Sequence, residues 1–367
     1  MKFTAERTHL ADAIARAQRA VASRTGALPV LSGLRLSVTD GRLELVGSDL
    51  ELTIRATMSV DGTGDEPAVL PARLLSDVVR EMAGDRVTIE VIDDEAKIAS
   101  GRTNITLRTL AAADFPRLPD IEGSGVRVDA AAFEDALRQV VPAASNDDAR
   151  PILTGVLLTA SAEGLRLVAT DSYRLAVRDL PGVSMLAEGQ KVLVAAKGLG
   201  EVQRLIATGE LEVVLGEREV VFRVDDTEVT TRLIEGDFPN YEQLIPASYP
   251  NKLTVARGAL ADAVKRVRLV GQGRDNAPVR LAMSASGLEL SAVAQDVGEA
   301  HEDVEAKYEG GDVTVAFNSQ FLLEGIEAVG SDEVTVETID PLKPAVMRGA
   351  GSGSGDYLYL LMPVRIS

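Results

Sequence analysis

Apolar residues recur every three or four positions in six stretches of the chain, which is the spacing of one buried face on an α-helix. These stretches cover residues 7–21, 72–83, 130–142, 196–207, 257–270 and 318–329. In the first of them, Leu10, Ile14 and Ala17 fall on the same face. The pattern therefore predicts six amphipathic helices.

Alternating apolar and polar residues, the pattern of half-buried β-strands, follow each predicted helix. After the first, third and fifth helices the text reads "LRLSVTDGRLELVGSD", "VLLTASAEGLRLVATD" and "VRLAMSASGLELSAVAQD". Asp-Gly, Glu-Gly and Ser-Gly stand where these segments would turn as hairpins. The order of helix, strands, helix, strands predicts an α+β fold with two helices packed on antiparallel sheet, because a parallel sheet would alternate strand and helix.

The whole pattern occurs three times, with a period of about 122 to 127 residues. The segments "GRLELVGSDLELTIRA" (41–56) and "GLRLVATDSYRLAVRD" (164–179) share four residue types at an offset of 122. Proline after phenylalanine in "DFPRLPDIE" (114–122) and "DFPNYEQLIP" (237–246) ends a strand and begins a linker. We therefore expect three repeated domains, at residues 1–122, 123–249 and 250–367.

The composition excludes several classes of protein. No apolar run approaches the roughly 20 residues that a membrane-spanning helix needs, so we expect a cytoplasmic protein with no membrane partner. The absence of cysteine excludes disulfides, thiolate metal sites and thiol nucleophiles. The two histidines, His9 and His301, lie too far apart in sequence to give a metal-ligand spacing, so we expect no metal and no cofactor.

The net charge of −18 argues against an open basic surface that would bind DNA by releasing counterions. The charge is nevertheless unevenly distributed. The six helix segments contain 12 Lys or Arg and 9 Asp or Glu, a net charge of +3 that leaves −21 on the remaining residues. The helical side is therefore mildly basic, whereas the rest of the chain is strongly acidic.

Two other functional classes compete at this point. An enzyme would need catalytic groups, but the pairs Asp93-Asp94, Asp147-Asp148 and Asp225-Asp226 occur in turn-rich text, where adjacent aspartates are usually solvated. The run "GAGSGSGD" (349–356) lacks the ending of a phosphate-binding loop. A sugar-binding or ligand-binding β-rich repeat protein fits the triplication and the acidity, but with 4% aromatic residues and no tryptophan the chain has little to stack on a sugar.

Several segments together resemble the bacterial sliding clamp family, the β subunit of DNA polymerase III, over the whole chain. They are "SRTGALPVLSGLRL", "AADFPRLPD", "RPILTGVLL", "VATDSYRLAV", "FPNYEQLIP", "FNSQFLLEGI", "DPLKPAVMRG" and "YLLMPVRI". The resemblance implies a non-catalytic processivity factor: a head-to-tail homodimeric ring around double-stranded DNA. It also implies a clamp loader, a replicative DNA polymerase and other proteins with clamp-binding motifs as partners.

The resemblance also implies a pocket for partner peptides of the Gln-Leu-x-Leu-Phe type. Its expected residues come from the second repeat, the second linker and the third repeat: Leu153, Thr170, Ser172, Arg174, Leu175, Pro239, Leu244, Asn318, Val346, Met362, Pro363, Val364 and Arg365. An apolar cleft with a few polar groups suits an extended peptide. The sequence departs from the family pattern at Gln243 and at Ser172-Tyr173, so we expect polar contacts in this pocket that differ from those of relatives.

The same resemblance supplies candidate contacts for DNA and for ring closure. The expected DNA-contacting residues are Arg24, Lys197, Lys265 and Arg266. For the seam between two chains, the strand "GRTNITLRT" (101–109) offers Arg102, Ile105 and Leu107. The third repeat offers Leu269, Val270, Glu299 and Glu302. Opposite charge around a small apolar centre would suit a head-to-tail interface.

Overall fold

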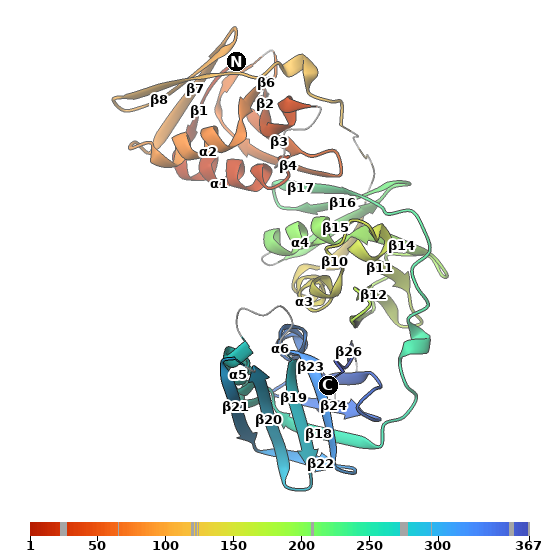
Figure 1. Cartoon of the computed structure of the whole chain (residues 1–367). Coiled ribbons are helices and arrows are strands. Elements are labelled where there is room, and N and C mark those ends of the chain that lie inside the picture. The colour runs from red at the N-terminus through yellow and green to blue at the C-terminus, as the bar shows by residue number, and fades with distance from the viewer. Residues whose placement is uncertain are drawn as a thin grey trace. The chain divides into compact units, whose positions relative to one another are not determined.

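The computed structural model describes residues 1–22, 28–64, 66–118, 121, 123, 125–206, 209–271, 278–294, 296–351 and 356–365. The chain divides into two compact units (Figure 1). The first unit contains Met1–Ala131 and Gly198–Leu233, and the second contains Ala132–Lys197 and Ile234–Ser367. Each unit therefore combines segments that are distant in sequence.

All six predicted helices are confirmed within the described residues. They are α1 (Arg7–Gln18), α2 (Ala72–Glu81), α3 (Ala130–Val140), α4 (Ala196–Leu205), α5 (Arg257–Val267) and α6 (Ser319–Ala328). Each helix begins within two residues of its predicted start and ends before its predicted end. The shortfall at the C-terminal ends arises because periodic apolar residues continue past the last helical turn.

Each repeat has three successive strands after each of its helices, and most of the remaining strands stand just before a helix. After the first helix of the repeats come β2 (Gly33–Thr39), β3 (Arg42–Ser48) and β4 (Leu52–Ser59); β11 (Gly155–Ala160), β12 (Gly164–Thr170) and β13 (Arg174–Pro181); and β19 (Pro278–Ser284), β20 (Gly287–Ala294) and β21 (Gly298–Val304). After the second helix come β7 (Arg86–Ile92), β8 (Glu95–Ser100) and β9 (Thr103–Arg108); β15 (Glu210–Leu215), β16 (Glu219–Val224) and β17 (Thr227–Arg232); and β24 (Glu333–Thr338), β25 (Ala345–Gly349) and β26 (Tyr357–Leu361). The others are β1 (Lys2–Glu6), β5 (Asp61–Thr63), β6 (Ala68–Pro71), β10 (Val126–Asp129), β14 (Lys191–Ala195), β18 (Asn251–Ala256), β22 (Ala306–Glu309) and β23 (Val313–Asn318).

Sheets run from one repeat into the next. In the first unit β4 of the first repeat pairs antiparallel with β17 of the second, giving the strand order β10-β15-β16-β17-β4-β3-β2-β6. In the second unit β13 of the second repeat pairs with β26 of the third, giving β14-β11-β12-β13-β26-β25-β24-β18-β22. The same positions of the repeat make both joints: the third strand after the first helix and the third strand after the second.

Two strands at these positions have no strand partner on their outer side among the described residues. The strand β9 ends the sheet β5-β1-β7-β8-β9 in the first unit, and β21 ends the sheet β21-β20-β19-β23 in the second. Three repeats joined in a row leave one such edge at each end of the series. Each unit thus presents one open edge of the kind that is paired elsewhere in the chain.

The core of the first unit lies between its helices and two sheets. Figure 1 shows α1 and α2 side by side over the strands. Leu10 and Ile14 of α1 and Leu75 of α2 belong to one buried cluster together with Leu34 and Leu36 of β2. Because alternate residues of a strand point to opposite faces, Arg35 lies on the face of the sheet away from these helices.

Close packing of α1 on β3 depends on a glycine. A Cβ atom at Gly47 would lie 2.1 Å from the carbonyl oxygen of Ala17 in α1. No L-amino acid with a side chain fits there unless the helix moves away from the strand.

We expect Gly47→Ala to lower the free energy of unfolding of the first unit by about 1–3 kcal/mol, the usual effect of overpacking. Differential scanning calorimetry should show a lower melting temperature than for the wild type. Gly258→Ala, in α5, is the matched control, because no atom lies within 4 Å of its added Cβ and alanine favours a helix. Equal melting temperatures for Gly47→Ala and the wild type would contradict this account of the packing.

Candidate peptide-binding site

The corner between β12 and β13 is a tight turn built on one aspartate. The Asp171 carboxylate accepts hydrogen bonds from the backbone N–H groups of Tyr173 (2.9 Å) and Arg174 (3.0 Å). The Thr170 hydroxyl donates to the carbonyl oxygen of Arg174 at 2.6 Å. Ser172 has φ +80°, in the left-handed region that short polar residues tolerate in turns. The polar residues Thr170, Asp171 and Ser172 therefore determine the backbone conformation of the corner.

The first repeat forms the same corner between β3 and β4. Asp49 accepts from the N–H groups of Glu51 (3.1 Å) and Leu52 (2.8 Å), and Leu50 has φ +78°. The two corners differ at the residue that opens the following strand. Leu52 is 1% exposed in the core of the first unit, whereas its counterpart in the second repeat is Arg174.

Arg174 is a buried cation with several partners and 7% exposure. Its guanidinium forms ion pairs with Asp171 (3.0 Å) and with Glu324 of α6, and it donates to the carbonyl oxygen of Pro142. The guanidinium carbon also lies 4.2 Å from the ring centroid of Phe321. A buried charge is tolerated when it is paired and hydrogen-bonded in this way. Arg174 therefore ties the corner to the third repeat and holds it in place.

Tyr359 of β26 completes this cluster. Its hydroxyl donates to the carbonyl oxygen of Phe321 at 2.9 Å and accepts from Arg174 at 3.4 Å. Burial raises the pKa of the Tyr359 phenol well above its ordinary value, so the group stays neutral and can donate. The cluster thus joins β13, β26 and α6 across two repeats.

The C-terminal tail lies against the corner. After β26, the Met362 N–H donates to the Tyr173 carbonyl oxygen at 2.9 Å, and the Val364 N–H donates to the Ala316 carbonyl oxygen of β23 at 2.8 Å. Pro363 and Val364 are half-buried, and Arg365 is exposed. The structure therefore brings the predicted tail residues next to the predicted corner residues.

A wholly apolar row crosses five strands beside the corner. The directly opposed residues are Leu193, Leu157, Val168, Val177 and Leu358, on β14, β11, β12, β13 and β26. They form one buried cluster with Leu175 and Val346, both predicted pocket residues. This part of the second unit thus supplies an apolar floor.

The second linker covers part of this floor. Tyr241 belongs to the same cluster, and Phe238 packs against it with its ring centroid 6.4 Å from that of Tyr241. Pro239 and Leu244, the predicted linker residues, are exposed. Tyr173 and Met362, joined by a backbone hydrogen bond, are 61% and 37% exposed. Exposed apolar side chains beside a buried apolar floor are typical of a partner-binding surface.

Two predicted pocket residues have a mainly structural part in this site. Leu153 is buried in a short 3₁₀ helix (Pro151–Thr154) that precedes β11. The Asn318 side chain is also buried, and it caps α6 by accepting from the N–H groups of Gln320 (2.9 Å) and Phe321 (3.1 Å). Ser172 is exposed, and its hydroxyl accepts from Arg150 at 3.4 Å.

Sequence reasoning missed the partners of Arg174 and the apolar row. Glu324 lies in the one predicted helix that has no basic residue, but nothing in the sequence connects it to Arg174. Strict alternation in Tyr357–Leu361 could have placed Tyr359 and Leu358 on opposite faces of β26.

The described residues among the predicted DNA contacts, Lys197, Lys265 and Arg266, all belong to the second unit. Arg24 lies outside the described residues. Lys197 is exposed on α4. In α5, Lys265 pairs with Glu327 of α6 at 2.7 Å, and Arg266 pairs with Glu302 of β21 at 2.9 Å. Much of the positive charge predicted for the helices is therefore balanced locally.

The predicted seam residues lie on or near the two open edges. Ile105 is half-buried on β9 and Arg102 is exposed in the turn before that strand, whereas Leu107 is 6% exposed and belongs to the core of the first unit. In the second unit, Glu299 and Glu302 lie on β21. Leu269 is exposed and Val270 half-buried, both in the 3₁₀ helix Arg268–Gly271.

The aspartate pairs have structural roles in turns. Asp94 pairs with Arg108 at 2.8 Å, Asp147 with Arg150 at 2.8 Å, and Asp226 with Arg42 at 3.1 Å. Within the described ranges, no cluster of three or more His, Cys, Asp or Glu side chains has the arrangement of a metal site. Nor is any helix in those ranges long and apolar enough to span a bilayer.

Comparison with known proteins covers the chain from end to end. Three family descriptions match: the N-terminal, central and C-terminal domains of the DNA polymerase III beta subunit, over residues 1–119, 127–240 and 242–365. The beta sliding clamp of Streptomyces coelicolor is 34% identical over 384 residues, with 100% of both chains covered.

Solved structures agree. A sliding clamp from Bartonella birtlesii bound to griselimycin is 29% identical with a TM-score of 0.92, and the DNA polymerase sliding clamp of Bacillus subtilis is 27% identical with a TM-score of 0.90. Both matches cover 100% of each chain. The three repeats, the corner with its tail and these similarities lead to one conclusion: the chain belongs to the family of bacterial sliding clamps, the β subunits of DNA polymerase III.

Proposed function

We propose that two copies of this chain close head to tail into a ring around double-stranded DNA, and that the corner, linker and tail of each copy hold partner proteins. As a sliding clamp the chain is a non-catalytic processivity factor for DNA replication. We further propose that a clamp loader opens the ring, that a replicative polymerase docks on it, and that it works in the cytoplasm.

The observation that carries the ring proposal is the pair of open edges. The joints β4–β17 and β13–β26 use equivalent positions of the repeat, and β21 and β9 are the remaining strands at those positions. A third joint of the same kind, between β21 of one copy and β9 of the other, would pair both edges. Arg102 on one side and Glu299 on the other have opposite charges, which supports this pairing.

The charge distribution supports DNA binding by enclosure. The chain carries −18 overall, and Lys265 and Arg266 are already paired within the second unit. Basic residues that are already paired in this way would release few counterions on meeting DNA, so the direct affinity of the helices for DNA would be low. A ring needs little affinity because the closed chain holds the duplex mechanically. The division into three domains, with boundaries after residues 122 and 249, is also part of what we propose.

The apolar floor and the tail support peptide binding at the corner. Leu175 and Val346 belong to the floor, and the exposed Met362 has a flexible thioether that adapts to different side chains. Tethering a polymerase through such a site raises its effective concentration at the primer end. The B. birtlesii clamp bound to griselimycin is consistent with a ligand-accepting surface in this family.

We expect deletion of Met362–Ser367 to abolish binding of a labelled peptide with a Gln-Leu-x-Leu-Phe motif. The reason is that Met362 and Val364 lie against the corner, whereas β26 ends at Leu361 and would keep its pairing with β13. Fluorescence anisotropy measures the binding, and light scattering should show an unchanged dimer. The matched control is Leu74→Ser, which removes an exposed apolar side chain on α2 of the first unit, outside the site. Undiminished peptide binding after the deletion would refute the assignment of the tail.

We expect Ile105→Glu to convert the dimer to monomers, because it places a carboxylate at the apolar centre of the seam, opposite the acidic β21. Light scattering coupled to size exclusion measures the mass. Leu107 is unsuitable for this test because its replacement would disrupt the core. Ile92→Glu, an exposed isoleucine on the inner strand β7, should remain dimeric. A persistent dimer for Ile105→Glu would rule out β9 as the seam strand.

A further inference from the structure

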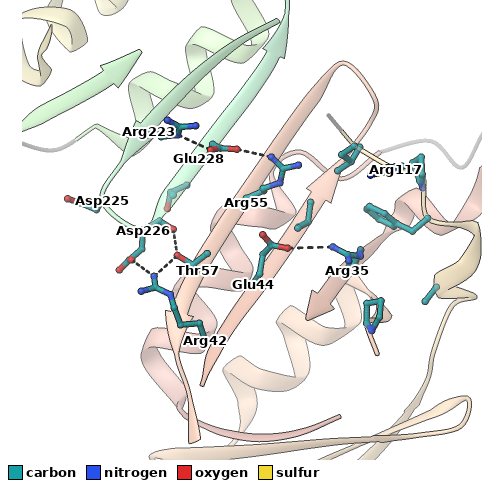
Figure 2. A pocket seen from close by; sticks show the side chains of 17 residues that line it. Arg35, Arg42, Glu44, Arg55, Thr57, Arg117, Arg223, Asp225, Asp226 and Glu228 are labelled. Carbon is teal, nitrogen blue, oxygen red and sulfur yellow. Dashed lines mark hydrogen bonds and ion pairs between the residues drawn. The ribbon is translucent and has the colours of Figure 1, made fainter. Parts of the chain in front are cut away.

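A polar depression of about 760 Å³ lies in the first unit, on the sheet face away from α1 and α2 (Figure 2). Its lining includes five arginines, namely Arg35, Arg42, Arg55, Arg117 and Arg223. Four acidic residues and the first linker, with Phe115 and Pro116, complete most of the wall. A concentration of arginine is unexpected on a chain of net charge −18.

The depression occupies the position in the first unit that the apolar floor occupies in the second. The directly opposed residues across β6, β2, β3, β4 and β17 are Val69, Arg35, Val46, Arg55 and Glu228. The corresponding residues across β14, β11, β12, β13 and β26 are Leu193, Leu157, Val168, Val177 and Leu358. The strand registers are the same. At three of the five positions the first unit has a charged side chain where the second unit has an apolar one.

The linkers also correspond. Phe115 and Pro116 beside the depression match Phe238 and Pro239 beside the apolar floor. Both surfaces are therefore a five-strand row bordered by a Phe-Pro linker. The backbone has the same form in both, and the chemistry of the row differs.

The charges in the depression are only partly balanced. Arg55 pairs with Glu228 at 2.8 Å, and Glu228 also pairs with Arg223 at 3.0 Å. Arg35 reaches Glu44 only at 3.5 Å. Arg117 is exposed and has no ion pair with any residue in the described part of the chain.

Figure 2 shows Asp225 and Asp226 at one side of the depression, together with Arg42 and Arg223, and Arg35 and Arg117 at the other side. Thr227 also lines it; this residue is 5% exposed, and its hydroxyl has no hydrogen-bond partner among the described residues. On the side with Arg35 and Arg117, the guanidinium groups have the weakest ion pairing in the depression within the described residues.

We propose that this depression is a second partner-binding groove, which takes an extended peptide segment with acidic side chains. Arg35, Arg55 and Arg117 bind the carboxylates, which match the planar donor pairs of guanidinium groups. Acidic side chains of the peptide replace the apolar ones that the second unit would accept. Duplex DNA is the less suitable ligand, because five arginines and four acidic residues leave the lining a net charge of only +1, and binding to a phosphate backbone depends on many cations that release counterions.

The test uses two labelled peptides that differ only in the motif: one has Gln-Leu-Ser-Leu-Phe and the other has Gln-Glu-Ser-Glu-Phe. We expect saturable anisotropy with the acidic peptide at low salt, and weaker binding as sodium chloride screens the ion pairs. The full-length variant Arg35→Leu/Arg55→Val, which installs the residues of the second unit, should weaken acidic-peptide binding at least about tenfold, as expected when charged hydrogen bonds are lost. Its binding of the leucine peptide at the corner should be unchanged.

Matched controls separate this proposal from the proposed function. Arg80→Leu/Arg86→Val removes two exposed arginines of the first unit outside the depression, and it should bind the acidic peptide as the wild type does. Deletion of Met362–Ser367 should also leave acidic-peptide binding intact. If the double variant fails to fold, Arg117→Glu replaces it in the peptide titration, because Arg117 is exposed on the linker and its replacement does not affect the core.

Three results would overturn the proposal. The first is the absence of saturable binding to the wild type, and the second is equal binding by wild type and Arg117→Glu. The third is a duplex-DNA titration in which Arg35→Leu/Arg55→Val loses DNA affinity while acidic-peptide binding is unchanged, since the arginines would then serve nucleic acid.

Discussion

Backbone pairing between the third strands of successive repeats, one after the first helix and one after the second, is the constraint on which the rest of this structure depends. The edges of β4 and β13 would be exposed if each repeat folded alone, and β17 and β26 cover them. This pairing builds the two long sheets, and it carries β26 and the tail that follows it to the corner of the second repeat. It also leaves β9 and β21 with open edges, because a linear series always has two ends.

The site at the corner shows how such pairing places chemistry. Once β26 lies beside β13, Tyr359 and Arg174 face the same cluster, and α6 brings Glu324 and Phe321 to it. The buried guanidinium has enough partners to offset its desolvation, so the turn that precedes it is held in one geometry. The exposed residues of the turn and of the tail, Tyr173 and Met362, can then present a defined surface without being rigid themselves.

Sequence periodicity predicted the six helices and the threefold repeat because those signals are local and recur at fixed spacing. The family resemblance supplied the pocket residues, and the structure brings the corner and tail residues together. Pairings between distant residues could not be read from the text. Arg266 and Glu302 were predicted on two different surfaces, for DNA and for the seam, yet they bind each other. Leu107 was predicted at the seam as part of an alternating strand, but alternation alone does not tell which face of β9 meets the core.

The two matched rows, one apolar and one charged, separate the shape of a surface from its chemistry. Arg35 and Arg55 stand where Leu157 and Val177 stand in the other unit, and the strand registers around them are unchanged. Side chains on that face point away from the helix core. At the joint between repeats each row keeps a matched pair, Arg55 with Glu228 in one unit and Val177 with Leu358 in the other, so the chemistry of a row can change as long as opposed residues change together. A duplicated scaffold of this kind lets a protein evolve a new ligand preference in one copy while the other copy keeps its original one.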